Sequence, residues 1–343
     1  MTDVRERVRK FVLSASRWTG VARFASPYLA GIGAILMLHS VTVRPRRALG
    51  VNAHLSITPD FLDRAIADMK RAGYTFVSLD ELAEAMAGKR RSVAAITLDD
   101  AYLDNYVEAL PVFESHGVPF TIFVAPGLID GAVQPWWEVV EELALAHDRI
   151  TLPQSAGGTD LASRSRAEKH AAARQLMTLM TTDISEAGRQ AVLDEMGGRA
   201  VATSPFMSWD QIEEIDRHPL CTIGAHTIHH YNLARLDNDV ALAEMLGSAD
   251  ILEKRLGHRP VHFAYPYGYA AAVGAREVRL AEQAGFRTAV TTRHGTIHRE
   301  HRDHFHALPR ISLNGNYQGI GHLRTMLTGF SAFANSGRRV VTL

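Results

Sequence analysis

The stretch TPDFLDRAIADMKRAGYTFVSL, residues 58–79, contains one complete structural unit. Thr58 followed by Pro59 is a strong helix start, because threonine caps a first turn and proline suits the first helical position. The apolar residues that follow keep a helical spacing as far as Gly73, which stands where the glycine after a helix belongs. Residues 74–79 then suit a short strand. The stretch therefore predicts a helix, a glycine turn and a buried strand.

The same unit returns twice along the chain. Gly117 stands just before the run PFTIFVA, and Gly285 precedes the run FRTAVTT. Residues 34–39 (AILMLH) and 93–98 (VAAITL) are two more short apolar runs that suit buried strands. Helices that alternate with such strands predict a parallel α/β fold, in which functional groups gather at the carboxyl ends of the strands.

Two segments fall outside this alternation. Residues 130–208 show no strand pattern and are helical in composition, so we expect a helical insertion that covers the rim of the fold. Residues 1–33 predict an amphipathic helical segment that packs on the domain or lies on a membrane surface. We therefore expect one domain over residues 34–343, with the insertion inside it.

The composition limits the partners and the compartment. Lysine plus arginine and aspartate plus glutamate both number 37, which indicates no basic surface for a nucleic acid. The single Cys221 excludes an internal disulfide and fits a reducing compartment. Because Asp3 and Glu6 argue against a signal peptide, we expect a cytoplasmic protein, membrane-associated if residues 1–33 contact lipid. The sequence does not indicate an oligomeric state.

Two short motifs fall at the ends of predicted strands and can share one metal ion. Asp99 and Asp100 end the run ITLDD, and His226 and His230 stand four residues apart in GAHTIHH. On a helical turn, positions i and i+4 share a face, so both imidazoles can reach one ion. Two histidines and one carboxylate leave coordination positions open for water and substrate. The other carboxylate is then free to act as a general base, which predicts a metal-dependent hydrolase.

Some of these features also have a purely structural interpretation. Two adjacent acids after a strand often begin a helix, so Asp99 and Asp100 indicate chemistry only in combination with the histidine pair. Trp136 and Trp137 suit either stacking on a sugar ring or anchoring the first helix of the insertion. The five histidines within residues 294–306 are irregularly spaced among arginine and glutamate, which is typical of a solvated loop.

The combination of motifs resembles the polysaccharide deacetylases of carbohydrate esterase family four, the NodB homology domain. In that family a T-F-D-D-G motif supplies a base and a metal ligand, an H-[S/T]-x-x-H motif supplies two histidine ligands, and a third motif ends in P-Y-G. This sequence has TLDDA at 97–101, HTIHH at 226–230 and HFAYPYG at 262–268. The resemblance covers roughly residues 34–125 and 209–313.

The resemblance implies a fold and a set of roles. The fold is a distorted (β/α) barrel of the NodB type, with the helical insertion described above. The catalytic base is Asp99. The metal ligands are Asp100, His226 and His230. The backbone N–H of Tyr267 helps to bind the oxyanion.

The departures from the family pattern imply two further roles. Ala101 stands where the family has glycine, a change that matters only if this residue needs a positive φ. The arginine of the third motif is replaced by Ala264-Tyr265, and the C-terminal L-x-H-D motif with the catalytic histidine is absent. The sequence is similar to the F-A-Y-P-Y-G branch, related to exopolysaccharide deacetylases of the poly-N-acetylglucosamine type, in which the histidine follows the first strand. That resemblance implies His39 as the catalytic histidine, and Arg310 as the replacement for the missing arginine.

The function implied is removal of N-acetyl groups from N-acetylglucosamine units of an oligo- or polysaccharide such as a chitooligosaccharide. Zn²⁺ is the expected ion, and Co²⁺, Ni²⁺ or Fe²⁺ also suit two histidines and one carboxylate. A first alternative is a deformylase or deacylase of a lipid-linked sugar or another amide, which the basic amino terminus favours. A second is a catalytically silent glycan-binding protein, which the absent third-motif arginine favours.

Overall fold

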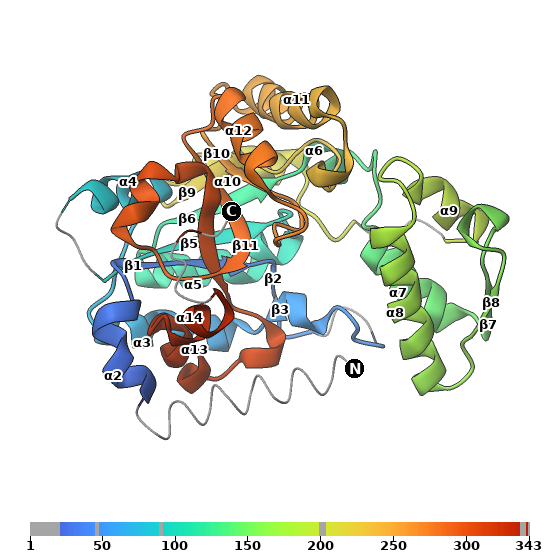
Figure 1. Ribbon diagram of the computed structural model, residues 1–343, viewed down its shortest axis with the longest axis horizontal. Helices are drawn as coiled ribbons and strands as arrows, with labels where there is room; N and C mark the ends of the chain where they lie inside the picture. The colour runs from blue at the N-terminus through green and yellow to red at the C-terminus, as the bar shows by residue number, and fades with distance from the viewer. Residues whose placement is uncertain (1–20, 45–47, 89–91, 199–203, 337–340, 342–343) are drawn as a thin grey trace.

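Seven parallel strands close into a barrel, as the predicted distorted (β/α) barrel requires (Figure 1). The computed structural model describes residues 21–44, 48–88, 92–198, 204–336 and 341. Around the barrel the strands are β1 (Gly33–Leu38), β12 (Leu308–Ser312), β11 (Thr288–His294), β10 (His262–Ala264), β9 (Cys221–Ala225), β6 (Phe120–Val124) and β5 (Val93–Asp99). The barrel is closed because β5 also pairs with β1, from Gly33 opposite Val93 to Leu38 opposite Leu98. An eighth strand, β4 (Thr75–Phe76), pairs with the start of β5.

The predicted unit of helix, glycine and strand is present, with a shorter strand. Helix α3 (Pro59–Arg71) begins after Thr58, whose side chain accepts a backbone hydrogen bond as the expected cap. Gly73 has a φ of +86°, a left-handed conformation that glycine adopts without strain. The strand is short because Ser78 forms a capping box that begins helix α4 (Leu79–Ala87). Leu79, expected to end the strand, is therefore the first residue of a helix.

Alternate residues of the strands belong to different hydrophobic clusters. Ile35 of β1 and Ala95 of β5 belong to one cluster, which also includes apolar residues of α4. Their neighbours Leu36 and Ile96 belong to a second cluster, formed with the outer helices. Side chains of a strand alternate between its two faces, so the first set faces the barrel interior. Asp99 continues the register of Ala95, and its side chain therefore lies inside the barrel at the carboxyl end of β5.

Helices and short connections surround the strands (Figure 1). Besides α3 and α4, the outer helices are α2 (Val21–Leu29), α5 (Leu110–His116), α6 (Pro126–Ile129), α10 (Trp209–Asp216), α11 (Asn238–Leu256), α12 (Ala275–Gln283), α13 (Ile320–Leu327) and α14 (Phe330–Ser336). The short helical turns are η1 (Ala53–Leu55), η2 (Asn105–Ala109), η4 (Leu233–Arg235), η5 (Arg299–Asp303), η6 (Phe305–Ala307) and η7 (Gly315–Tyr317). Two short strands, β2 (Ser40–Val41) and β3 (Ser56–Ile57), pair outside the barrel.

Most of the described residues between 130 and 208 form a lobe beside the barrel, drawn mainly in green in Figure 1. We call this segment the insertion lobe. It contains α7 (Trp136–Ala146), η3 (Gln154–Ala156), α8 (Arg166–Thr182) and α9 (Arg189–Glu195). Most of its buried apolar side chains belong to one cluster, which also includes Leu49, Tyr102, Ala125 and Leu128 from outside the lobe. The lobe is not wholly helical, because β7 (Arg149–Thr151) and β8 (Asp160–Ala162) form an antiparallel hairpin. Only the central residue of each strand is buried, a pattern too short to indicate a strand in the sequence.

The first 20 residues of the predicted amino-terminal segment lie outside the described part of the chain. Helix α2 (Val21–Leu29) exposes two aromatic side chains, Phe24 (83%) and Tyr28 (84%). Within the described residues, no helix combines the length and the apolar character needed to cross a membrane.

Candidate active site

The three predicted metal ligands meet at the carboxyl end of the barrel. Asp100 follows the last residue of β5, and His226 follows the last residue of β9. The Nε2 atoms of His226 and His230 lie 3.5 and 3.2 Å from the same Asp100 oxygen, Oδ1. One ligand atom from each residue lies within 4.8 Å of the others. Residues from two separate motifs are thus brought to one point.

The donors of this group fit one divalent cation. Asp100 Oδ1 is buried and has no hydrogen-bond partner among the described residues. The Nδ1 of His226 donates to the Ala264 carbonyl oxygen at 2.6 Å, which leaves Nε2 as the free nitrogen and fixes the ring. Burial alone would raise the pKa of Asp100. His230 and His226 lower it by more than burial raises it, so the pKa lies well below its usual range. An ionised carboxylate facing two imidazole nitrogens matches the donors that Zn²⁺ binds.

The two histidines do not lie on a helical turn, and the sequence argument from i, i+4 spacing is wrong. Residues 226–230 form a loop, in which Thr227 and His230 have φ values of +60° and +56°. Glu244 of α11 shapes this loop, because its Oε2 accepts hydrogen bonds from the N–H groups of Ile228 and His229 at 3.0 and 2.9 Å. A bent loop, rather than a helix face, therefore directs both rings to one point. Sequence reasoning gave no role to Glu244.

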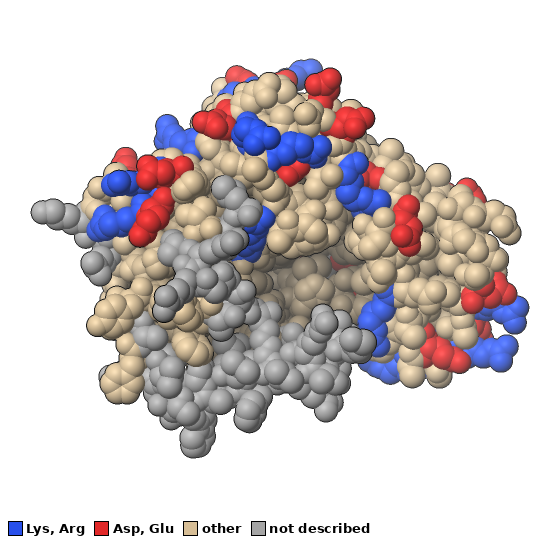
Figure 2. Space-filling view, in the orientation of Figure 1, with Lys and Arg blue, Asp and Glu red and all other residues tan. Residues whose placement is uncertain are grey.

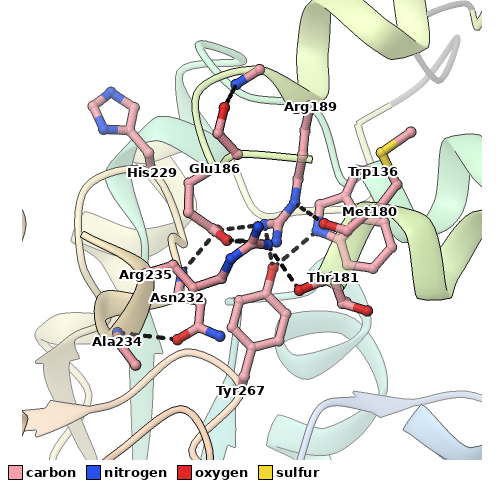
Figure 3. Close-up of polar contacts among 12 residues, drawn as sticks. Trp136, Met180, Thr181, Glu186, Arg189, His229, Asn232, Ala234, Arg235 and Tyr267 are labelled. Carbon is pink, nitrogen blue, oxygen red and sulfur yellow. Dashed lines mark hydrogen bonds and ion pairs between the residues drawn. The ribbon is translucent and has the colours of Figure 1, made fainter. Parts of the chain in front are cut away.

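His229 is directed away from the metal-ligand group. Its Nδ1 lies 2.6 Å from Glu244 Oε1, and its ring stacks on Tyr231. Figure 3 shows it at the edge of the network around Tyr267. The hydrogen bond to Glu244 raises the pKa of His229.

Arg310 and His39 both lie beside Asp99. Arg310 of β12 donates two hydrogen bonds to the Asp99 carboxylate, each 2.7 Å long, and both side chains are buried. The guanidinium also donates to Thr97 Oγ1 and to the Thr291 carbonyl oxygen. His39, directly after β1, places its Nε2 3.9 Å from Asp99 Oδ2. The structure thus places both side chains beside Asp99, although neither residue belongs to the third motif.

The charges around Asp99 offset the effect of burial on its pKa. Burial raises the pKa of Asp99, but the Arg310 guanidinium and its hydrogen bonds lower it to a net value below the usual range. Burial also lowers the pKa of His39, while the nearby carboxylates of Asp99 and Asp100 raise it in part. Asp99 is consequently ionised and oriented, as a general base must be.

Tyr267 lies at a tight turn after β10. Its φ is +64°, and the Gly268 N–H donates to the Pro266 carbonyl oxygen at 2.8 Å. A hydrogen bond from i+2 to i around a positive φ is the rare form of γ-turn. Thr292 of β11 holds the other side of the turn, because its hydroxyl donates to the Tyr267 carbonyl oxygen at 2.6 Å. The Tyr267 ring packs against His230, with 5.2 Å between ring centroids.

Backbone strain is concentrated at this site. Among the described residues, six that are not glycine have positive φ, and five of them belong to the site: Asp100, Ala101, Thr227, His230 and Tyr267. Such conformations cost energy and persist where the surroundings enforce them, which is common at functional sites. Ala101 has a φ of +55°, so the position does require the conformation for which glycine is suited.

A cavity of about 460 Å³ opens over the site. Asp99, Asp100, His39, His226, His230 and Tyr267 line its floor and one wall, and Trp136, Trp137, Met177, Thr178 and Thr181 of the insertion lobe line another. Figure 2 shows the surface hollowed between the barrel and the lobe. Trp137 anchors the lobe through a hydrogen bond to the Tyr102 hydroxyl, and its ring lies 5.0 Å from that of His230. The structure thus shows Trp137 in the anchoring role, and stacking of either tryptophan on a sugar ring stays a prediction.

The model of the polysaccharide deacetylase family matches residues 158–289, which include His226, His230 and Tyr267. This part of the chain is therefore similar to the polysaccharide deacetylases. The segment TLDDA, with Asp99 and Asp100, lies outside the matched residues, but it ends β5 at the same site. No curated protein matches the sequence.

Solved structures support the deacetylase fold. A Streptococcus pyogenes deacetylase, PplD, in complex with acetate, is 22% identical, with a TM-score of 0.56 and coverage of 85% of this chain and 97% of that one. IcaB from Ammonifex degensii is 17% identical, with a TM-score of 0.55 and coverage of 86% and 97%. A de-N-acetylase from Aggregatibacter actinomycetemcomitans is 14% identical, with a TM-score of 0.55 and coverage of 86% and 99%. At these identities the likeness establishes the fold alone.

The histidine-rich segment 294–306 of this domain is not the solvated loop expected from its spacing. It includes the end of β11 as well as η5 and η6, and His301 is fully buried. Within the described residues, it provides no group of ligands for a second metal. The histidines of this segment therefore have structural roles in β11, η5 and η6 or in the connections between them.

Proposed function

We propose that this chain is a metal-dependent deacetylase that removes N-acetyl groups from N-acetylglucosamine units of an oligo- or polysaccharide. The observation that carries the proposal is the pairing of Asp99 with Arg310 beside the group formed by Asp100, His226 and His230. One carboxylate is directed to the metal-ligand group, and the adjacent one is held by a cation. Two neighbouring carboxylates in such different surroundings can serve as ligand and as base.

Asp100, His226 and His230 would hold the cation, with Zn²⁺ as the proposed ion. When bound, such an ion polarises the acyl oxygen and lowers the pKa of water. Asp99 then accepts the proton of the attacking water. Arg310 holds the Asp99 carboxylate in one orientation through its paired hydrogen bonds, and it keeps that carboxylate ionised.

Two further groups supply the remaining requirements of amide hydrolysis. The backbone N–H of Tyr267 is positioned by the γ-turn to stabilise the negative charge that develops on the acyl oxygen; removal of one such donor typically costs about 2.7–4 kcal/mol. His39 donates a proton to the departing amine nitrogen, a role worth about 10²–10⁴-fold in rate. Burial lowers the pKa of His39 overall, and the carboxylates of Asp99 and Asp100 oppose that effect in part.

The shape of the site supports a carbohydrate substrate. The cavity is open to the surface and is lined by Trp136, Trp137 and Tyr269 around the candidate ligands. Aromatic rings beside a catalytic group suit the apolar face of a sugar ring. The match of residues 158–289 to the polysaccharide deacetylase family and the fold shared with a de-N-acetylase support this class of substrate.

The experiment is acetate release from N-acetyl-chitooligosaccharides by the metal-reconstituted protein, beside the Asp99→Asn variant. We expect release by the wild type alone, with one metal ion bound per chain in both proteins. Formate release from an N-formyl sugar without acetate release would favour the deformylase alternative. Binding of the oligosaccharide without release of either acid would favour the silent glycan-binding protein.

A further inference from the structure

A buried ion pair in the insertion lobe lies behind the candidate site. Glu186 precedes α9 and Arg189 is the first residue of that helix; their side chains are 0% and 6% exposed. Arg189 Nη2 donates to Glu186 Oε1 at 2.6 Å, Nη1 donates to Oε2, and Nε donates to the Met180 carbonyl oxygen at 2.8 Å. A buried charged pair is favourable only when further hydrogen bonds satisfy both groups. Some of these further hydrogen bonds join the pair to residues outside the lobe.

The arginine of this pair holds the side chain of Tyr267. Arg189 Nη1 donates to the Tyr267 hydroxyl at 2.9 Å, and Trp136 Nε1 donates to the same oxygen at 3.0 Å (Figure 3). The guanidinium carbon also lies 5.2 Å from the Trp136 ring centroid and 5.6 Å from that of Tyr267. Two donors of the lobe therefore fix the ring of the residue whose backbone forms the γ-turn.

The glutamate of the pair holds the segment that follows His230. Glu186 Oε2 accepts from the Asn232 N–H at 2.9 Å, and Asn232 stands two residues after His230. Glu186 Oε1 accepts from Arg235 Nη1 at 3.2 Å, and the same Nη1 donates to the Thr181 carbonyl oxygen. Figure 3 shows these bonds meeting around one carboxylate. One ion pair of the lobe thus contacts both loops that bring His230 and Tyr267 to the site.

The pair acts without contact to the substrate cavity. Glu186 and Arg189 do not line the 460 Å³ cavity; they line a smaller space of about 40 Å³ behind Trp136. The Tyr267 ring, which Arg189 contacts, and the Trp137 ring pack against the His230 ring at centroid distances of 5.2 and 5.0 Å. A displacement of the Tyr267 ring therefore changes both the γ-turn and the wall against which His230 packs.

We propose that Glu186 and Arg189 are positioning residues, through which the insertion lobe sets the geometry of the Tyr267 turn and the His230 loop. The inference rests on the proposed function, because that function gives Tyr267 and His230 their roles. In this arrangement the barrel supplies the reacting groups, and the lobe fixes two of them in place. Misplacement of a reacting group by about 1 Å can cost roughly 10²-fold in rate.

The test compares Arg189→Met and Tyr267→Phe, singly and together, with wild type. We expect each single variant to lower kcat for N-acetyl-chitooligosaccharides at least tenfold with KM changed less than twofold. We expect the double variant to lose no more than the stronger single variant, because both changes remove one connection. Tyr267→Phe deletes a single oxygen and keeps the ring, so it tests the connection even if Arg189→Met does not fold. The matched control is Arg149→Met, which breaks the Arg149–Asp160 pair on the hairpin of the same lobe and should keep the wild-type kcat.

A second measurement separates this inference from the proposed function. Co²⁺ alone is titrated into each metal-free protein, and its visible absorption reports the geometry around the ion without any substrate. We expect Arg189→Met and Tyr267→Phe to weaken Co²⁺ binding or to change the spectrum, with Arg149→Met unchanged. If the wild type released no acetate, this result would still support the positioning role while the proposed function failed. Folded variants with wild-type kcat and wild-type Co²⁺ spectra would overturn it.

Discussion

Arg310 and Asp99 form a buried pair with two parallel hydrogen bonds of 2.7 Å, from strands that lie on either side of β1. The third motif of this chain has no arginine, and the cation for the candidate base arrives from a strand 211 residues away in sequence. A charge-assisted, paired bond fixes the orientation of a carboxylate as well as its ionisation. Arg310 therefore supplies the cation beside Asp99, although it lies far from the third motif in the sequence.

Replacement of Arg310 by methionine should remove this orientation. We expect Arg310→Met to lower kcat/KM for acetate release by at least about 10²-fold, since a positioned base contributes about 10²–10⁴-fold. We also expect a loss of about 3–5 kcal/mol of unfolding free energy, because Asp99 is left buried without its partner. Arg287→Met is the matched control, since its pair with Asp80 lies on the surface. Normal turnover in Arg310→Met would exclude the role of this pair.

The metal ligands can be tested by thermal unfolding. Zn²⁺ at about 100 times its Kd stabilises the native state by about 2.7 kcal/mol, so the Tm of the wild type should rise on addition of Zn²⁺ and fall with a chelator. Asp100→Asn should lose both the bound metal and this shift, whereas Asp99→Asn should keep them, because only Asp100 Oδ1 faces the two Nε2 atoms. Equal Zn²⁺ affinity in both variants would contradict this division of roles.

His39 should affect turnover without affecting metal content. Its Nε2 lies 3.9 Å from Asp99, and it is not part of the metal-ligand group. We expect His39→Gln to bind one metal ion and to lose about 10²–10⁴-fold in kcat, as expected for a general acid. His54→Gln, at another histidine of the same cavity, serves as the control and should retain most of its activity. A near-normal kcat in His39→Gln would assign the proton donor elsewhere.

Local signals in the sequence predicted the barrel better than the loops. Gly117 and Gly285 adopt φ values of +58° and +82°, and each is followed by a barrel strand where the sequence indicated one. Asp99 and Asp100 could be placed at the rim because side chains that end parallel strands meet at one edge. These features depend on a few neighbouring residues, and a single sequence contains that information.

Features that depend on distant residues could not be predicted in this way. The loop from His226 to His230 is shaped by Glu244 of α11, and nothing in its own spacing distinguishes it from a helical turn. In the sequence, Glu186 and Arg189 resemble charged surface residues of a helical segment. Their burial cannot be predicted there, because their partners belong to the loops after β9 and β10. In each case the deciding contact joins residues that only the folded chain brings together.

The left-handed conformation at Ala101 can be tested by substitution. Ala101→Gly should change the unfolding free energy by less than about 1 kcal/mol. Relief of about 1–2 kcal/mol of strain is opposed by the lost methyl group, worth about 0.8 kcal/mol, and by the greater freedom of unfolded glycine. Ala101→Val should destabilise by more than about 2 kcal/mol, because a β-branched residue resists a positive φ and the site is buried. Denaturation in urea measures both changes, and a valine variant as stable as wild type would show that the turn can relax.

His301 should make the fold sensitive to acid. Burial lowers the pKa of this histidine from 6.5 to about 4, so the folded protein favours the neutral ring. The contribution of this neutral ring to the free energy of unfolding is fully present above the unfolded pKa of about 6.5, and it is lost as the pH falls towards 4. In that range the unfolded chain binds a proton that the folded chain does not. At about 1.4 kcal/mol per pKa unit, the total is roughly 3 kcal/mol.

We expect the unfolding free energy to change with pH more steeply in the wild type than in His301→Gln. His301 is the third residue of η5, where its ring nitrogen accepts a hydrogen bond from the His298 N–H, and glutamine suits that position. Between pH 7 and pH 4.5 the wild type should lose unfolding free energy faster than His301→Gln, while His304→Gln, at an exposed neighbour, should follow the wild type. Urea denaturation at several pH values measures the slopes. Parallel curves for wild type and His301→Gln would show that this ring does not titrate between the folded and unfolded states.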